Sequence, residues 1–109
     1  MANDEHVALL KKGMGAWNAW RDENPDIRPD LVQADLRDAY LRGANLSVAN
    51  LQEADLFRAY LHGANLSGAN LTDAELSAAV LDRAVLIGAK CSSQTNLRGH
   101  ASTMRTSAG

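Results

Sequence analysis

Residues 39–58 read AYLRGANLSVANLQEADLFR, and residues 59–78 read AYLHGANLSGANLTDAELSA. Thirteen of the twenty aligned positions are identical, so this part of the chain repeats with a period of twenty residues. Within that period, leucine stands at every fifth position, and alanine stands two residues before nearly every leucine. The leucines of these pentads are Leu31, Leu36, Leu41, Leu46, Leu51, Leu56, Leu61, Leu66, Leu71, Leu76, Leu81 and Leu86.

A period of five residues matches neither the 3.6-residue repeat of an α-helix nor the two-residue alternation of a flat strand. It requires a chain that turns a corner every five residues and returns a leucine to a common axis. Four pentads then make one coil, and equivalent residues of successive coils stack on one another. The sequence therefore predicts an all-β solenoid of about three four-sided coils, filled by leucine along the axis and by alanine methyl groups at the corners.

Two further residue types recur at fixed places in the pentad. Glycine falls two residues after a leucine at four places, where we expect a turn that needs a positive φ. These glycines are Gly43, Gly63, Gly68 and Gly88. Asparagine often precedes the leucine, and we expect Asn45 to stack with Asn65, and Asn50 with Asn70, as hydrogen-bonded amide ladders.

The pattern A-(D/N)-L-x-x, present as ADLRD, ANLSV, ANLQE, ADLFR, ANLSG and ANLTD, resembles the pentapeptide-repeat family. The resemblance covers residues 30–90 and implies a right-handed quadrilateral β-helix. Val80 and Val85 depart from the consensus, and the register fails later in the chain. We therefore expect the β-helix over residues 30–93 and an irregular tail over residues 94–109, with disorder of that tail as the alternative.

Residues 1–29 precede the repeat and predict an N-terminal capping α-helix with a lead-in. A solenoid exposes its apolar core at both ends unless something covers it. Asn3 or Asp4 can cap a helix that runs to about Asp22, and the segment WNAWRDENPDIRPDL is similar to lead-ins of bacterial pentapeptide repeats. The apolar residues expected to cover the first coil are Leu10, Met14, Trp17 and Trp20.

The charge and cysteine content exclude several classes of partner. The net charge is −2, from 13 acids and 11 bases, so no strong attraction to nucleic acid or to an anionic membrane is expected. One cysteine cannot form an internal disulfide, which favours a reducing compartment. The first residues lack the pattern of a signal peptide, and no apolar run approaches the ~20 residues of a membrane span. We therefore expect a cytoplasmic protein.

The sequence offers no set of catalytic residues. His6, His62 and His100 lie in three separate segments, and no two of them have metal-ligand spacing. No Ser-His-acid set, Cys-His set or glycine-rich phosphate loop is apparent. We therefore expect a protein that is not an enzyme, with no catalytic residue, cofactor or metal.

One column of acids raises the question of a metal or binding stripe. Asp35, Asp55 and Glu75 should stack on one side of the coil. Arg37 and Arg58 stand near them and offset their charge. A solvated face is the interpretation we favour.

An aromatic face is the strongest candidate for binding a partner. Tyr40 and Tyr60 should stack, with basic residues beside them and one phenylalanine around the corner. The alternative is a plain cross-coil aromatic pair, which stabilises a sheet by itself. The residues of this candidate face are Tyr40, Arg42, Phe57, Arg58, Tyr60 and His62.

The last coil has no comparable helix after it in the sequence. We therefore predict a homodimer stacked end to end through Val85, Ile87, Cys91 and Leu97. Cys91 takes the inward position that leucine fills elsewhere, so we expect it to be buried as a small hydrophobic residue.

Three functions remain after these exclusions. The favoured one is a scaffold or protein-interaction module whose partner is unknown. The family resemblance implies an alternative, a DNA mimic that inhibits or protects a type II topoisomerase (DNA gyrase). Three coils span about 15 Å and a dimer about 30 Å, where B-DNA carries roughly 18 phosphates against about −6 on the two coils, so this alternative is weaker. The third is small-ligand binding at Tyr40 and Tyr60, although the leucine-filled axis leaves no cavity.

Overall fold

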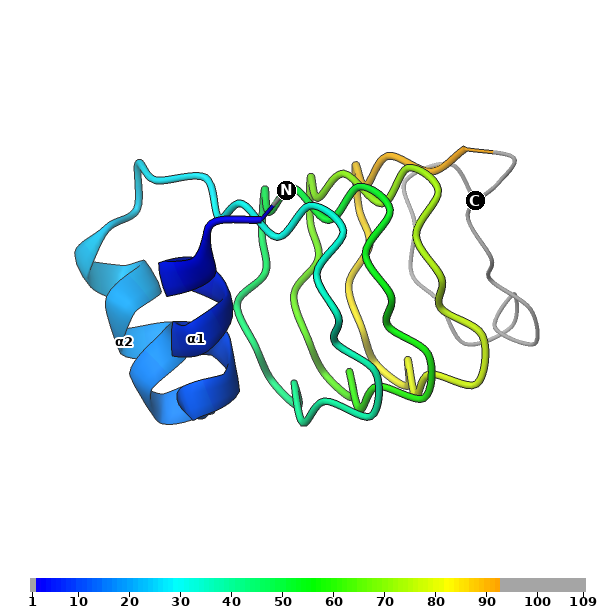
Figure 1. Cartoon of the computed structure of the whole chain (residues 1–109), viewed down its shortest axis with the longest axis horizontal. Coiled ribbons are helices and arrows are strands. Elements are labelled where there is room, and N and C mark those ends of the chain that lie inside the picture. The colour runs from blue at the N-terminus through cyan, green and yellow to red at the C-terminus, as the bar shows by residue number, and fades with distance from the viewer. Residues whose placement is uncertain (1, 93–109) are drawn as a thin grey trace.

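The computed structural model describes residues 2–92. Two short helices, α1 (Asp4–Lys12) and α2 (Met14–Glu23), lie against one end of a coil that winds around a single axis (Figure 1). Parallel bridges join residues that are twenty apart, from the Asp30–Asn50 pair to the Asn70–Lys90 pair. Each five-residue step therefore forms one side of the coil, and the period of twenty residues is confirmed.

Ladder hydrogen bonds hold each coil to the next. Leu51 N donates to Asn70 O at 2.8 Å, and Asp55 N donates to Ala34 O at 2.9 Å. This arrangement pairs backbone groups that would otherwise be buried without partners. It also turns the leucine side chains to the axis, where all twelve are at most 2% exposed.

A tight turn separates neighbouring sides of the coil. Ala34 N donates to Leu31 O at 3.1 Å, and the third residue of that turn, Gln33, has a φ of 59°. The same position has a positive φ in every pentad, including Gly43 at 70° and the β-branched Val48 at 54°. The expectation of left-handed glycines is therefore confirmed, and the conformation extends to residues that tolerate it less well.

The asparagine before the leucine has a local role. Asn70 Oδ1 accepts hydrogen bonds from Thr72 N at 3.1 Å and Thr72 Oγ1 at 2.6 Å. Asn65 Oδ1 likewise accepts from Ser67 N at 3.0 Å. Where Asn or Asp precedes the leucine, its side chain thus fixes the start of the turn through an Asx motif, whereas the sequence predicts that the amides bond to one another across coils. That expectation is wrong for the Oδ1 atoms of Asn65 and Asn70, because each accepts its hydrogen bond from the backbone N–H two residues later in the same coil.

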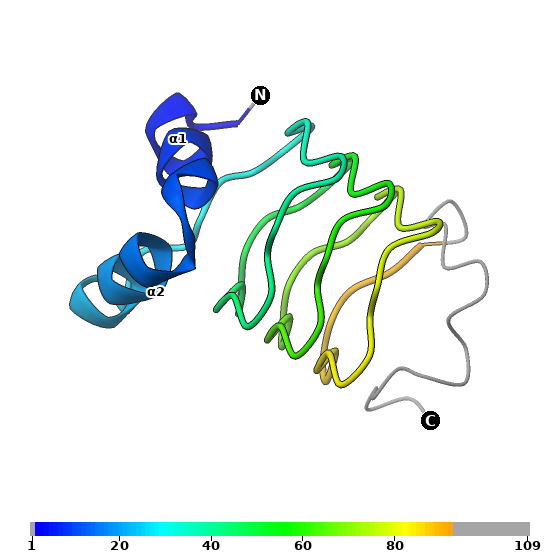
Figure 2. The ribbon, with the colours of Figure 1, turned by 90° about the horizontal axis from the view of Figure 1, so that it is seen from below.

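The N-terminal segment forms two helices where the sequence predicted one. Asn3 Oδ1 accepts from Glu5 N at 2.9 Å and from His6 N at 3.3 Å, so the predicted N-cap is confirmed. The prediction of one continuous helix to about Asp22 is wrong, because Gly13 has a φ of 135° and ends α1. Figure 2 shows α1 and α2 side by side at the end of the coil.

Side chains of α2 bond to the backbone of the first coil. Trp17 is fully buried, and its Nε1 donates to Asn45 O at 2.8 Å. Arg21 Nη2 donates to Ser47 O at 2.8 Å. Leu10 of α1 joins the same apolar core, and Met14 and Trp20 pack against it half-buried.

The other end of the described chain differs from the prediction at one residue. Cys91 is exposed, so the expectation that it is buried like the leucines before it is wrong. Val85 is half-buried and Ile87 is 52% exposed. Leu97 and the expected tail over residues 94–109 lie outside the described residues.

Within residues 2–92, neither helix has the length and apolarity that crossing a membrane requires.

Substitution by alanine should lower the unfolding free energy at a turn glycine but not at a glycine within a helix. A Cβ added at Gly43 meets nothing within 4 Å, so Gly43→Ala isolates the strain of a left-handed alanine. We expect a loss of about 1 kcal/mol in unfolding free energy, measured by urea denaturation.

Gly15→Ala is the matched control, because this glycine lies in α2 and also has open space around its Cα. There we expect no loss, and a gain of up to about 1 kcal/mol. An equal loss for the two variants would contradict the assignment of positive φ to the turn.

Candidate functional site

The aromatic pair of the candidate face is formed as expected. The Tyr40 and Tyr60 rings stack with centroids 4.7 Å apart and planes tilted by 16°. Tyr40 is 75% exposed, Tyr60 is 40% exposed, and Val80 continues the same column at 37% exposure. One side of the coil therefore carries an apolar stripe that faces solvent.

One basic residue of the candidate face has an acidic partner. Arg58 Nε lies 3.2 Å from Asp38 Oδ1 and forms an ion pair with it. Arg42 is exposed and His62 is half-buried. Phe57 is 39% exposed and stands at the neighbouring corner. The structure therefore joins the two tyrosines directly and places Arg58 in an ion pair of its own.

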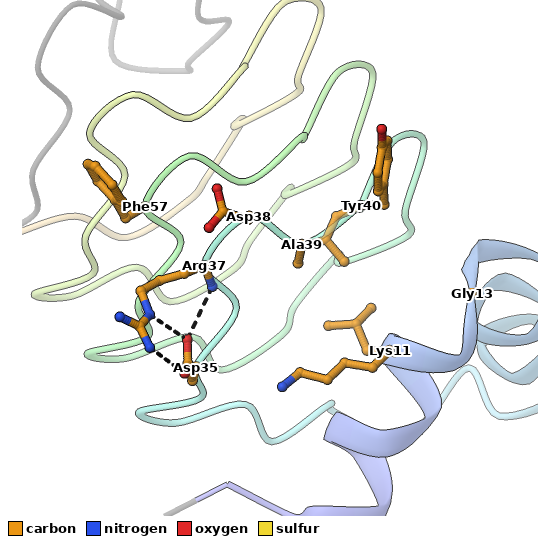
Figure 3. Close-up of a pocket in the computed structure, with 10 residues that line it drawn as sticks. Lys11, Gly13, Asp35, Arg37, Asp38, Ala39, Tyr40 and Phe57 are labelled. Atoms are coloured by element: carbon orange, nitrogen blue, oxygen red, sulfur yellow. Dashed lines mark hydrogen bonds and ion pairs between the residues drawn. The ribbon is translucent and has the colours of Figure 1, made fainter.

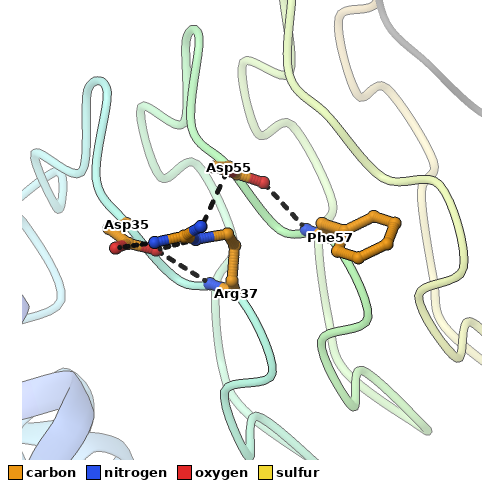
Figure 4. A network of polar contacts seen from close by, with 4 residues as sticks. All are labelled: Asp35, Arg37, Asp55 and Phe57. Atoms are coloured by element: carbon orange, nitrogen blue, oxygen red, sulfur yellow. Dashed lines mark hydrogen bonds and ion pairs between the residues drawn. The ribbon is translucent and has the colours of Figure 1, made fainter.

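An ion-pair network occupies the side next to the aromatic pair (Figure 4). Arg37 donates from Nε and Nη2 to the two carboxylate oxygens of Asp35, each at 2.9 Å. Its Nε also lies 3.7 Å from Asp55 Oδ2 in the next coil. Asp55 Oδ1 in turn accepts from Phe57 N at 3.1 Å. Arg37 thus bridges two coils and offsets the two acids, as the sequence predicted for this residue, whereas Arg58 pairs with Asp38.

The paired arginine changes the acidity of Asp35. Hydrogen bonds from the side chain and backbone of Arg37 lower the pKa of Asp35 to about 2, and the charges of Arg37 and Lys11 act in the same direction. The carboxylate is fully ionised at neutral pH. Asp35 is therefore a hydrogen-bond acceptor at neutral pH, and it carries no proton that a general acid could donate.

A cavity of about 570 Å³ lies between the end of α1 and the first coil (Figure 3). Its walls combine apolar side chains of both parts with the ion-pair network. The residues that line it are Leu10, Lys11, Gly13, Asp35, Arg37, Asp38, Ala39, Tyr40, Leu41 and Phe57. The volume falls within the range of small-ligand pockets.

This cavity brings together residues that the sequence did not connect. Tyr40 and Phe57 belong to the predicted aromatic face, and both reach the cavity wall. Lys11 arrives from α1, and its ammonium extends toward Asp35 in Figure 3. The sequence carries no signal for Lys11, because its place depends on the break at Gly13 and on how α1 packs.

Metal binding finds no support in the part of the chain that the structure describes. Within residues 2–92, no group of three or more His, Cys, Asp and Glu side chains is arranged to hold a metal ion. The column of Asp35, Asp55 and Glu75 is joined by parallel bridges, with Arg37 inserted between its first two members.

Comparisons with known proteins agree on one family. The family model described as pentapeptide repeats matches residues 30–68 and 59–99, with eight copies. A solved pentapeptide repeat protein (Rfr23) from the cyanobacterium Cyanothece 51142 is 41% identical over 59% of this chain and 40% of its own, with a TM-score of 0.42. Another, alr5209 from Nostoc Pcc 7120, is 27% identical over 82% of this chain and 93% of its own, with a TM-score of 0.45.

This chain therefore spans less than half the length of the cyanobacterial Rfr23 protein. A search of curated proteins gave no match.

The pairing of Asp35 with Arg37 predicts a pH dependence. Since the folded-state pKa of about 2 lies below the ordinary 3.8, the pairing stabilises the fold above pH 3.8 and is lost as the pH falls through about 2. In Arg37→Ala, we expect the pKa of Asp35 to rise toward 3.8, followed by NMR of its carboxyl carbon.

Arg58→Ala serves as the control, because Arg58 pairs with Asp38 and not with Asp35. That variant should leave the Asp35 titration unchanged. An Asp35 pKa that stays near 2 without Arg37 would contradict Arg37 as the cause of the low value.

Proposed function

Because the chain belongs to the pentapeptide-repeat family, whose members fold as right-handed quadrilateral β-helices, we propose that it is a protein-interaction scaffold. Proteins of this family are generally structural repeat proteins without enzymatic activity. In this proposal the protein is not an enzyme and uses no cofactor. A rigid prism of about three coils presents side chains in rows to a protein partner.

The exposed column of Tyr40, Tyr60 and Val80 carries this proposal. Large apolar side chains on a rigid surface lose little conformational entropy when a partner covers them, and tyrosine is enriched among the residues that dominate binding energy. The ladder bonds beneath them, such as Tyr60 N to Ala39 O at 2.9 Å, hold their spacing. Phe57 extends the apolar surface around the corner.

Mimicry of DNA is the weaker candidate. A DNA mimic needs a dense row of unpaired negative charge. Here Arg37 binds Asp35 and lies near Asp55, and Arg58 binds Asp38, so positive charge stands among these acids. This pairing favours a protein surface over the DNA groove of a topoisomerase.

A homodimer through the last coil stays a prediction. The 52% exposure of Ile87 and the exposed Cys91 support it, because apolar groups at a coil end favour association. A monomer mass in sedimentation equilibrium at high micromolar concentration would contradict it.

We also propose that α1 and α2 cap the first coil. Trp17 supports this role, since its indole is buried against the coil and donates to Asn45 O. We expect Trp17→Ala to lower the unfolding free energy by about 3–5 kcal/mol in urea denaturation. A loss below about 1 kcal/mol would contradict a capping role, because surface changes have effects of that size.

The interaction surface can be tested by affinity capture. We expect the wild-type chain to retain a specific protein from a lysate of its source cells. The double variant Tyr60→Ser and Phe57→Ser should lose roughly tenfold or more of that capture, because two exposed aromatic side chains are removed.

Ile27→Ser is the control, since Ile27 is also 40% exposed but lies in the lead-in before the coil. Its capture should equal that of the wild type. Equal capture by all three proteins would mean that the aromatic face is not the binding surface.

A further inference from the structure

The first coil has no coil before it, so its backbone edge needs other partners. On one side, the backbone N–H of Asn45 donates to Asn18 Oδ1 at 2.8 Å, and the carbonyl of Asn45 accepts from Trp17 Nε1. On another side, the backbone N–H of Asp30 donates to His6 Nδ1 at 3.0 Å, and the carbonyl of Asp30 accepts from Asn3 N at 3.1 Å. Groups of the N-terminal segment therefore replace the missing coil on two of the four sides.

The other two sides have no such replacement. In the second coil, Asp55 N donates to Ala34 O and Tyr60 N donates to Ala39 O, each at 2.9 Å. The equivalent N–H groups of the first coil belong to Asp35 and Tyr40, and neither has a hydrogen-bond partner within residues 2–92. An open strand edge of this kind is a template for another strand.

The cavity of about 570 Å³ lies along this same edge (Figure 3). Asp35, residues 37–41 and Phe57 line it from the coil, and Leu10, Lys11 and Gly13 line it from the N-terminal segment. The helices thus cover the apolar core but leave space beside the unpaired N–H groups. That space is where the strand of a preceding coil would run.

We propose that this cavity binds a peptide segment of a partner protein, which follows the edge from Asp35 around the turn to Tyr40 and pairs with both sides in parallel, as a preceding coil would. The segment carries an aromatic residue, with an acidic residue five positions before it. This site deepens the proposed function, and it depends on the chain being an interaction module. Main-chain hydrogen bonds to the edge supply affinity, and the flanking side chains select the sequence.

The aromatic residue follows from the register of the coil. Residues paired across coils stack, as Tyr40 does on Tyr60 with ring centroids 4.7 Å apart. Tyr40 is 75% exposed, so a large part of its ring surface is open. A peptide residue paired with Tyr40 would lie beside that ring, where an aromatic side chain stacks favourably.

The acidic residue follows from charge. Among the charged side chains of the cavity, Arg37 binds Asp35, and Asp38 binds Arg58. Within the described residues, Lys11 has no carboxylate within 4.0 Å. A peptide residue paired with Asp35 comes five positions before the one paired with Tyr40. An acid there would stack on Asp35, as Asp55 does in the next coil, and the Lys11 ammonium, which extends toward Asp35, would offset the two carboxylates as Arg37 does between Asp35 and Asp55.

A displayed library of random ten-residue peptides, selected on the full-length protein, tests this proposal. We expect enrichment of sequences with an acid five positions before an aromatic residue. An enriched synthetic peptide should slow amide hydrogen exchange of Asp35 and Tyr40 by tenfold or more. The amides of Asp55 and Tyr60, already bonded within the coil, should change little.

Matched variants separate the site from its surroundings. Lys11→Gln should weaken an enriched peptide about two- to fivefold, as expected for an exposed ion pair, whereas Lys12→Gln should not, because Lys12 does not line the cavity. N-methylation of the peptide residue after the acid should abolish binding. In a parallel ladder that N–H donates to Asp35 O, as Leu36 N donates to Asp55 O between the first two coils.

Absence of enrichment, or a peptide that leaves the Asp35 and Tyr40 amides unprotected, would overturn the proposal. A peptide that protects the region around Tyr60 and Val80 instead would also overturn it. The variant Tyr60→Ser separates the two hypotheses, because Tyr60 does not line the cavity. If Tyr60→Ser abolishes lysate capture while the edge stays unprotected by peptide, the interaction scaffold stands and the peptide site fails.

Discussion

The backbone ladder between coils is the constraint on which the rest of the structure depends. Each side of a coil is too short to pair with itself, so its N–H and carbonyl groups find partners in the chain twenty residues away. That pairing fixes the distance between coils, turns every leucine to the axis, and forces a left-handed residue into each turn. Leucine fills the column that results, and alanine allows the corner to close.

The same constraint explains the special character of the first coil. A coil without a predecessor leaves its edge groups unpaired, which is unfavourable when they are buried and dangerous when they are exposed. Trp17, Asn18 and Arg21 satisfy part of this edge with side-chain donors and acceptors. The cavity beside Asp35 and Tyr40 is the part they leave open. The unpaired edge of the first coil thus explains both the contacts of the N-terminal helices and the candidate binding site.

Much of the fold could be predicted from the sequence, because the leucine pentad recurs twelve times and the twenty-residue period places Tyr40 over Tyr60. The break at Gly13 was not predicted, since a glycine in an apolar stripe fits both a strained helix and a helix end. The exposure of Cys91 depends on how the last coil is covered, which its own pentad does not encode. The role of Lys11 in the cavity depends on the packing of two helices that share no repeat with the coil.

Scalar coupling through the ladder hydrogen bonds tests the central claim most directly. In isotope-labelled protein, the amide nitrogen of Leu51 should couple to the carbonyl carbon of Asn70, because their N and O atoms lie 2.8 Å apart. Leu31 should couple to Asn50 in the same way, nineteen residues along the chain. Couplings at another sequence separation, or none at these leucines, would contradict the four-sided coil and every inference built on it.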